Sequence, residues 1–167
     1  LALVKLTTFS VVSAHQVPMF AKPGMVELLV RAADKGPTTE FKYIALSVLG
    51  SLAQAEQNAV SMLAKPGLVD VLMRAADRGE MDSNKTAGLL GLSHLTGAHA
   101  NRASMFAKPG LVEVLMRAAT AKADASQSEL AFASLANLAS EEKISGPMLS
   151  KAGLVEVLMR GVERGDT

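Results

Sequence analysis

The sequence predicts an all-α protein built from stacked helical repeats, and three observations support this prediction. The block Met-Phe-Ala-Lys-Pro-Gly at Met19–Gly24 returns in similar form every 43 residues, at Met62–Gly67, Met105–Gly110 and Met148–Gly153. A period of this length is typical of repeat proteins, in which neighbouring units bury each other's apolar faces. Within each unit the apolar residues follow a helical spacing. Apolar residues make up 49% of the chain and aromatic residues only 4%, so Leu, Val, Ala and Met must build the core.

One helix is predicted directly after each copy of the block, over Met25–Ala33, Leu68–Ala76, Leu111–Ala119 and Leu154–Val162. In the first copy only Glu27, Arg31 and the pair 34–35 interrupt the apolar residues, and these polar positions share one stripe of the helix. Pro-Gly before the first three copies predicts a sharp turn into the helix. A glycine after the helix, Gly36 or Gly79, suits its C-terminal end.

Another helix follows a short polar connection, which we place at Asp34–Thr39, Asp77–Asp82 and Thr120–Ala125. Its core positions recur 43 residues apart as Leu46/Leu89/Phe132, Leu49/Leu92/Leu135 and Leu52/Leu95/Leu138. This spacing has the period of a helix and not that of a strand. Leu3, Leu6 and Phe9 fit the same positions, so the given sequence is predicted to begin on this helix.

A shorter helix fills the rest of each unit, as in Glu56–Ala64 and Asn101–Ala107. Pro18 and Pro147 fall inside two of its copies. Because proline in a helix interior costs about 3 kcal/mol, we expect these two copies to begin later than the others. The predicted unit is therefore a short helix, a turn, a helix, a loop and a longer helix, and we number these helices first, second and third in that order.

This three-helix unit, with Ala-Leu-x-x-Leu-x-x-Leu-Ala at 45–53 and Gly-Leu-Val-x-x-Leu at 67–72, resembles the armadillo repeat. HEAT repeats are the near alternative, but the extra short helix and the turn at Gly67 favour armadillo. The resemblance implies a right-handed α-solenoid of about four 43-residue three-helix repeats, incomplete at both ends. We divide the single domain 1–167 into a leading third helix (1–13), three repeats (14–55, 56–98 and 99–141) and the first two helices of a trailing repeat (142–167).

In armadillo proteins that capture extended peptides, the third helices line a concave groove and present a recurring Trp and, four residues later, a recurring Asn. The Trp positions correspond here to Val4, Ser47, Leu90 and Ala133, and the Asn positions to Thr8, Ser51, His94 and Asn137. Only Asn137 matches, and the chain has no tryptophan. A bound peptide would therefore lack the regular backbone partners that the family uses.

The same positions still predict a candidate protein-binding surface on the concave face. Its residues are Tyr43, Ser47, Ser51, Gln54, Leu90, His94, Ala133 and Asn137. They are mostly small and weakly polar, which suits a partner helix or folded surface better than a charged tail. Small residues also simply allow helices to pack closely, and both interpretations stay open.

Charged residues recur with the same period. An acid precedes an arginine by four residues in each second helix, as in Glu27/Arg31 and Glu113/Arg117, which we interpret as stabilising pairs within one helix. A lysine also precedes each of these helices, at Lys22, Lys65, Lys108 and Lys151. A basic rim for an anionic partner is the alternative interpretation of that set.

Composition argues against several classes of function. The net charge of +1 provides no basic face for nucleic acid. No apolar run reaches the roughly 18 residues of a membrane span. The absence of cysteine removes disulfides, thiolate metal sites and thiol catalysis. His15, His94 and His99 lack the spacing of metal ligands, so we expect no metal, no cofactor and no enzymatic activity.

We therefore predict a non-catalytic protein–protein interaction or scaffold module, such as a peripheral subunit of a larger assembly. The alternative is an importin- or catenin-like receptor that holds an extended peptide in the concave groove. Neither end of the sequence has the polar face of a capping repeat, so we expect the ends to continue into further repeats or to dock on other subunits. Without a signal-peptide pattern, an intracellular location in the cytosol or an organelle is favoured over secretion.

Overall fold

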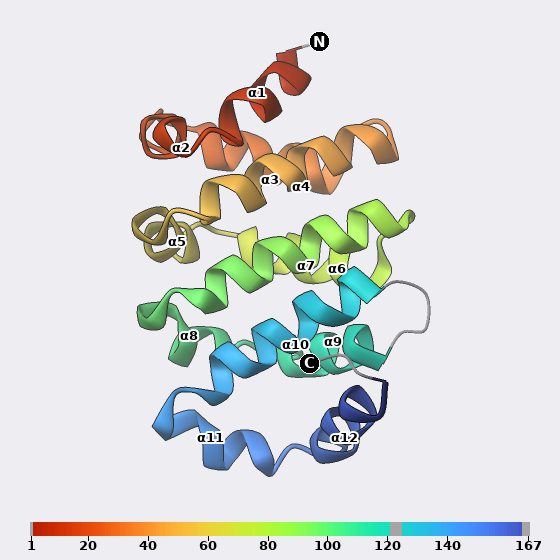
Figure 1. Ribbon diagram of the computed structural model, residues 1–167. Coiled ribbons are helices and arrows are strands. Elements are labelled where there is room, and N and C mark those ends of the chain that lie inside the picture. The colour runs from red at the N-terminus through yellow and green to blue at the C-terminus, as the bar shows by residue number, and fades with distance from the viewer. Residues whose placement is uncertain (1, 121–124, 165–167) are drawn as a thin grey trace.

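The computed structural model describes residues 2–120 and 125–164, and it is all-helical in these two ranges. The prediction of an all-α protein is confirmed. Helices follow one another along a single stack, with α1 at one end and α11 and α12 at the other (Figure 1). The predicted connection at Thr120–Ala125 falls mostly outside the described residues, as do the outermost residues of the first and last predicted units.

Three kinds of helix alternate along the chain. The short first helices are α2 (Ser13–Phe20), α5 (Glu56–Leu63), the 3-10 helix η1 (His99–Asn101) with α8 (Arg102–Phe106), and α11 (Glu142–Leu149). The second helices are α3 (Met25–Lys35), α6 (Leu68–Arg78), α9 (Leu111–Thr120) and α12 (Leu154–Arg164). The third helices are α1 (Ala2–Ser10), α4 (Thr39–Ala53), α7 (Asp82–Gly97) and α10 (Ala125–Ala139).

The turn before each second helix needs glycine. Gly24, Gly67, Gly110 and Gly153 have φ angles of 76°, 75°, 81° and 81°, in the left-handed region that other residues rarely adopt. In the second copy the turn is closed by the Leu68 amide, which donates to the Lys65 carbonyl over 3.3 Å. The same glycine's carbonyl then accepts the first bond of the helix from the Val71 amide. The recurring glycine thus sets the angle between the first and second helices of each unit.

The expectation that the proline-containing first helices begin late is wrong. α2 begins at Ser13 and α11 at Glu142, the positions that correspond to Glu56 in α5, and the prolines lie inside both helices. Pro18 is exposed, and so is Ala14, whose carbonyl would have accepted the missing amide hydrogen bond. Water can solvate that carbonyl at the surface, so the helix tolerates the proline there.

The core lies where each third helix packs against its neighbours. α7 contacts the preceding third helix α4 and the two helices of its own unit, α5 and α6. α10 packs in the same way on α7, α8 and α9, and α4 packs on α1, α2 and α3. Leu49, Leu92 and Leu135 occupy the same position in these three helices and are almost fully buried. Each unit therefore completes its core with side chains of the unit before it.

Candidate protein-binding surfaces

The predicted concave surface maps onto three third helices that contact one another in sequence, α4, α7 and α10. Tyr43, Ser47 and Ser51 lie on α4, and Gln54 follows the end of that helix. Leu90 and His94 lie on α7, and Ala133 and Asn137 lie on α10. All eight residues are partly or fully exposed.

The polar members of this surface are hydrogen-bonded within the protein. His94 donates from Nδ1 to the carbonyl oxygen of Gly50 on α4, over 2.8 Å. Asn137 donates from Nδ2 to Oγ1 of Thr96 on α7, over 3.4 Å. Gln54 accepts at Oε1 from Nε2 of Gln16, over 2.9 Å. The bonds of His94 and Asn137 connect neighbouring units, and the bond of Gln54 lies within one unit. All three side chains are therefore partly committed before any peptide backbone could reach them.

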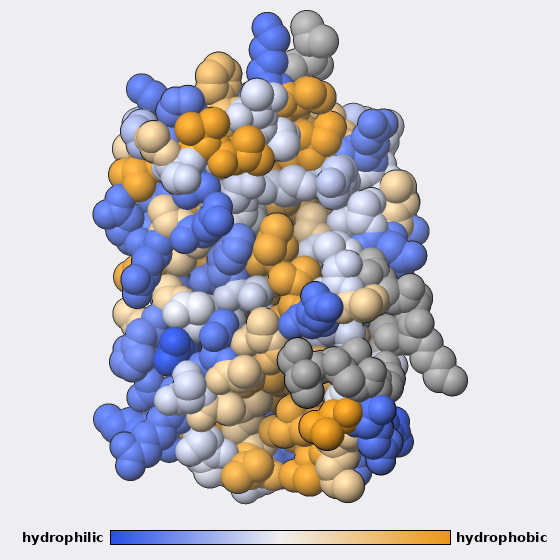
Figure 2. All heavy atoms as spheres, in the orientation of Figure 1, coloured by the Kyte–Doolittle hydropathy of each residue, from blue (hydrophilic) through white to orange (hydrophobic). Residues whose placement is uncertain are grey.

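Ala133 also borders a larger feature, which we call the end groove. It is the cavity of about 780 Å³ bordered by α10, α11 and α12, and its walls include Phe132, Leu149, Leu158 and Val162. Leu149 is 61% exposed and Val162 69%, high values for such side chains. Figure 2 shows apolar surface at the end of the stack that α11 and α12 form, and again at the opposite end near α1. Contiguous apolar surface of this kind marks interaction sites.

The repeat explains why the end groove is open. In the interior, each set of a third, a first and a second helix receives the next third helix: α7 packs on α4, α5 and α6, and α10 on α7, α8 and α9. The set α10, α11 and α12 is the next one in the series, and no further third helix covers it within the described residues. The end groove therefore has the shape of a binding site for a helix.

The groove floor carries a matched pair of substitutions. Phe132 stands where the earlier units have leucine, and Gly161 stands where α3, α6 and α9 have alanine. A Cβ atom on Gly161 would lie only 2.5 Å from Cζ of the Phe132 ring. The glycine therefore makes room for the larger side chain, and the pair brings an aromatic ring to the groove wall.

Ion pairs between consecutive units form one regular series at the second helices. Lys65 pairs with Glu27, Lys108 with Asp70 and Lys151 with Glu113, each over 2.8 Å. In each pair the lysine follows the acid by 38 residues. Hydrogen bonds from these lysines hold the pKa values of Glu27 and Glu113 below their ordinary value of 4.5.

This series corrects two interpretations of the charge pattern. The acids pair with lysines of the next unit, whereas the arginine four residues away in the same helix makes only a minor electrostatic contribution to the lowered pKa of Glu27 and Glu113. Three of the four lysines are engaged with these acids and do not form a free basic rim.

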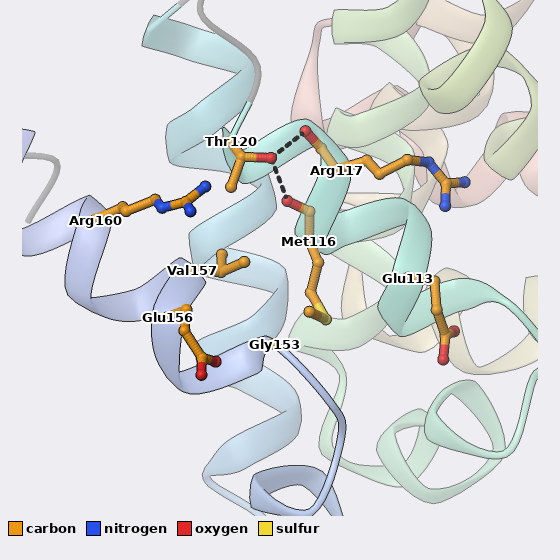
Figure 3. Close-up of a pocket in the computed structure, with 8 residues that line it drawn as sticks. All are labelled: Glu113, Met116, Arg117, Thr120, Gly153, Glu156, Val157 and Arg160. Atoms are coloured by element: carbon orange, nitrogen blue, oxygen red, sulfur yellow. Dashed lines mark hydrogen bonds between the residues drawn. The ribbon is translucent and has the colours of Figure 1, made fainter.

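A second series joins arginines to acids 40 residues earlier, Arg74 to Asp34 and Arg117 to Asp77. It is interrupted between α9 and α12, where Thr120 occupies the acidic position. Thr120 donates its hydroxyl hydrogen to the carbonyls of Met116 and Arg117, both over 3.1 Å. Figure 3 shows Arg160 reaching toward Thr120 across a cavity of about 500 Å³.

Two buried asparagines, which sequence reasoning missed, join the first helices. Asn58 donates from Nδ2 to the carbonyls of Gln16 and Leu52, over 3.1 and 3.0 Å. Asn101 repeats the arrangement 43 residues later, with the carbonyls of Ala59 and Leu95 over 3.0 and 3.1 Å. Their signal in the sequence is the same residue type, asparagine, at two positions one repeat length apart.

Among the described residues, no three His, Asp or Glu side chains are grouped so that they could hold a metal ion. No helix in the same ranges has both the length and the apolar character needed to cross a membrane. Searches with the whole chain found no matching family model, no matching curated protein and no matching solved structure. The function must therefore be inferred from the chain's own surfaces.

Proposed function

We propose that this chain is a non-catalytic protein–protein interaction module of the armadillo type, a right-handed α-solenoid that binds an amphipathic helix of a partner in the end groove. A peripheral subunit of a larger assembly is one form that this role takes. The observation that carries the proposal is the end groove itself, about 780 Å³ in volume and walled by exposed apolar side chains.

The chemistry of the groove favours a helix as its occupant. Its walls come from three helices whose interior counterparts each receive a third helix of the repeat. Burying apolar surface there contributes about 25 cal/mol per Å² removed from water. A helical partner with apolar residues at i, i+3, i+4 and i+7 matches both the shape and the polarity of such a groove.

The extended-peptide alternative has weaker support. His94 and Asn137, the polar residues of the concave surface best placed to hold a peptide backbone, already bond to the neighbouring third helix. Ser51 and Thr8 stand at two of the other positions where the armadillo pattern has asparagine. The concave surface therefore offers no regular series of free amide groups to an extended chain.

A peptide of stated sequence tests the proposal. The segment 39–53, which forms α4, is synthesised with blocked ends and a fluorescent label, and its binding to the 167-residue chain is followed by anisotropy. We expect saturable binding that Val162→Glu weakens at least tenfold, because a charge is placed in the apolar groove. Val60→Glu is the matched control, since Val60 is an exposed valine (41%) on α5, outside the groove.

Two results would contradict the proposal. Absence of binding at high micromolar chain concentration would mean that the groove does not accept a helix of this type. Binding that Val162→Glu leaves intact, but that His94→Ala and Asn137→Ala weaken, would favour the concave surface and the receptor alternative. Circular dichroism of each variant shows whether its helical fold is retained.

A further inference from the structure

We propose that a second copy of this chain supplies the helix that fills the end groove, so that copies of the chain stack head to tail. This inference rests on the proposed function, because it names the partner for the same groove. Helix α1 of the incoming copy would lie against α10, α11 and α12 of the first. Two observations carry it: the repeat position of α1, and the charges at the two ends of the stack.

Helix α1 belongs to the same series as the helices that fill the interior grooves. Its residues Ala2–Ser10 correspond, three repeat lengths earlier, to Ala131–Ala139 of α10. α10 packs on α7, α8 and α9. The corresponding site one repeat length further along the series is the end groove, formed by α10, α11 and α12. Among the described residues α1 packs on α2 and α4, and its side chains Val4 and Phe9 are both 53% exposed. The groove and the helix that matches it therefore lie at opposite ends of the stack of described helices (Figure 1).

The lysine series predicts an ion pair across this contact. Among the described residues Lys22, which begins the series of Lys65, Lys108 and Lys151, has no acidic partner. At the other end, Glu156 continues the series of acids and has no basic partner within those residues. In a head-to-tail stack, Lys22 of the incoming copy takes the position relative to Glu156 that Lys151 takes relative to Glu113.

The arginine series makes a corresponding prediction. Arg31 begins the series that continues as Arg74 and Arg117, and the described part of the chain contains no ion-pair partner for it. Glu163 continues the acidic positions of Asp34 and Asp77. One end of the stack thus presents two cations and the other two carboxylates at corresponding positions. Exposed pairs of this kind contribute little affinity, so their role is to select the orientation of the contact.

The end that presents Lys22 also has apolar surface to bury. Lys22 borders a hollow of about 400 Å³, whose walls include Phe9, Pro18 and Met25. Val11 and Val12, which follow α1, are exposed at the same end. Both sides of the proposed contact therefore combine apolar walls with charges at the rim, which is the composition of a specific protein interface.

Lys5 is the residue of α1 that fits the contact least well. The same repeat position holds Val48, Gly91 and Ser134, all buried where third helices meet. In the stacked pair the Lys5 ammonium must be desolvated or must extend to the rim, so it weakens the association. Replacing it by the valine of the next unit removes that cost. The inference therefore predicts a variant that binds better as well as variants that bind worse.

A contact between two different surfaces of one chain forms a ring where the rotation between copies closes, and otherwise continues as an open chain. A stack that continues the repeat runs on along the line of the helices in Figure 1, so each added copy presents a fresh end groove and the length grows with concentration. Sedimentation velocity across a micromolar concentration series measures this growth directly. We expect the weight-average mass of the 167-residue chain to rise with concentration, Val162→Glu to suppress the rise and Val60→Glu to leave it unchanged. Lys5→Val should strengthen association by roughly an order of magnitude.

Charge reversal tests the orientation. The variant Glu156→Lys/Glu163→Lys and the variant Lys22→Glu/Arg31→Glu should each associate less than the parent chain at low salt. Their equimolar mixture should recover association between unlike copies, because the reversed tail of one meets the reversed head of the other. Association that survives both reversals and Val162→Glu would overturn the inference, since another surface would then be responsible.

The inference would also be overturned if both the parent chain and Lys5→Val kept the mass of one copy at every concentration. The peptide assay with segment 39–53 then separates the two proposals. A single-copy chain that still binds the peptide in the groove leaves the proposed function standing with a different partner. A single-copy chain that does not bind it contradicts both.

Discussion

Removal of the Asn101 amide is the most direct test of how consecutive units are held together. The side chain is 1% exposed, and its Nδ2 donates to the carbonyl of Ala59 in the preceding first helix and to that of Leu95 at the end of α7. Asn101→Ala removes both N–H donors from the carbonyls of two residues, Ala59 and Leu95, that are fully buried. One side chain thus links three segments from two units.

The expected loss follows from these two bonds. A net contribution of about 1 kcal/mol for each bond, with a further cost for each buried acceptor left without a donor, predicts a loss of about 2–4 kcal/mol. Asn58→Ala removes the corresponding bonds to Gln16 and Leu52 and should cost a similar amount. Asn137→Ala is the matched control, because its amide is half-buried and makes one bond of 3.4 Å. That variant should lose less than about 0.5 kcal/mol.

Urea unfolding followed by circular dichroism measures these differences, since the chain has no tryptophan for fluorescence. Repeat proteins can unfold in parts, so the whole curve is fitted, and a variant is compared only where its slope matches that of the parent. Equal losses for Asn101→Ala and Asn137→Ala would refute the reasoning, because burial of the amide would then have no consequence. A loss below about 0.5 kcal/mol at Asn101 would refute it as well.

Four further outcomes are expected. Leu115→Ala should cost about 2–5 kcal/mol in urea unfolding because the side chain is fully buried, whereas Ser47→Ala, at the surface, should cost almost nothing. Gly88→Ala should cost at least about 1–3 kcal/mol, because the added Cβ would lie 2.7 Å from a backbone nitrogen of α6. Thr120→Asp should place a carboxylate beside Arg160 and so restore the interrupted ion pair between α9 and α12. The free energy of unfolding should rise by about 0.2–1 kcal/mol, a gain that high salt removes. The pKa of Glu113 is lowered by the hydrogen bond from Lys151, so the small stabilisation from this pair is present above pH 4.5 and is lost as the pH falls below it. Glu113→Gln should reduce this acid sensitivity, which is measured as unfolding midpoints on both sides of pH 4.5.

Local sequence patterns were sufficient to predict the helices. The apolar spacing of Leu46, Leu49 and Leu52 depends only on the period of a helix, and α4 forms where that spacing predicts it. The turn at Gly67 was predictable for the same reason, because a left-handed φ is a property of one residue. Pro18 misled the prediction, since the cost of proline depends on whether the carbonyl one turn earlier is buried, and Ala14 is exposed.

Contacts between units could not be predicted from local spacing. Glu27 and Arg31 look like a pair because they are four residues apart, yet the structure brings Glu27 to Lys65 instead. The buried hydrogen bonds of Asn58 were hidden for the same reason, because both of its acceptors belong to other helices. The eight residues of the concave surface remain a prediction, although their positions on α4, α7 and α10 are now known.

By itself, the sequence determined that the chain is all-helical, that its unit is 43 residues long and that the core positions of the interior units, such as Leu46, Leu49 and Leu52, face inward. At the end of the stack the same pattern was wrong, because Phe9 is 53% exposed. These properties follow from helix periodicity and repetition, which act over a few residues or at one fixed period. The tertiary structure alone decided which charges pair and which side-chain amides are buried. It also decided that α10, α11 and α12 border an open apolar groove. Those properties depend on how one unit stacks on the next, and stacking brings together atoms that lie about 40 residues apart in the chain.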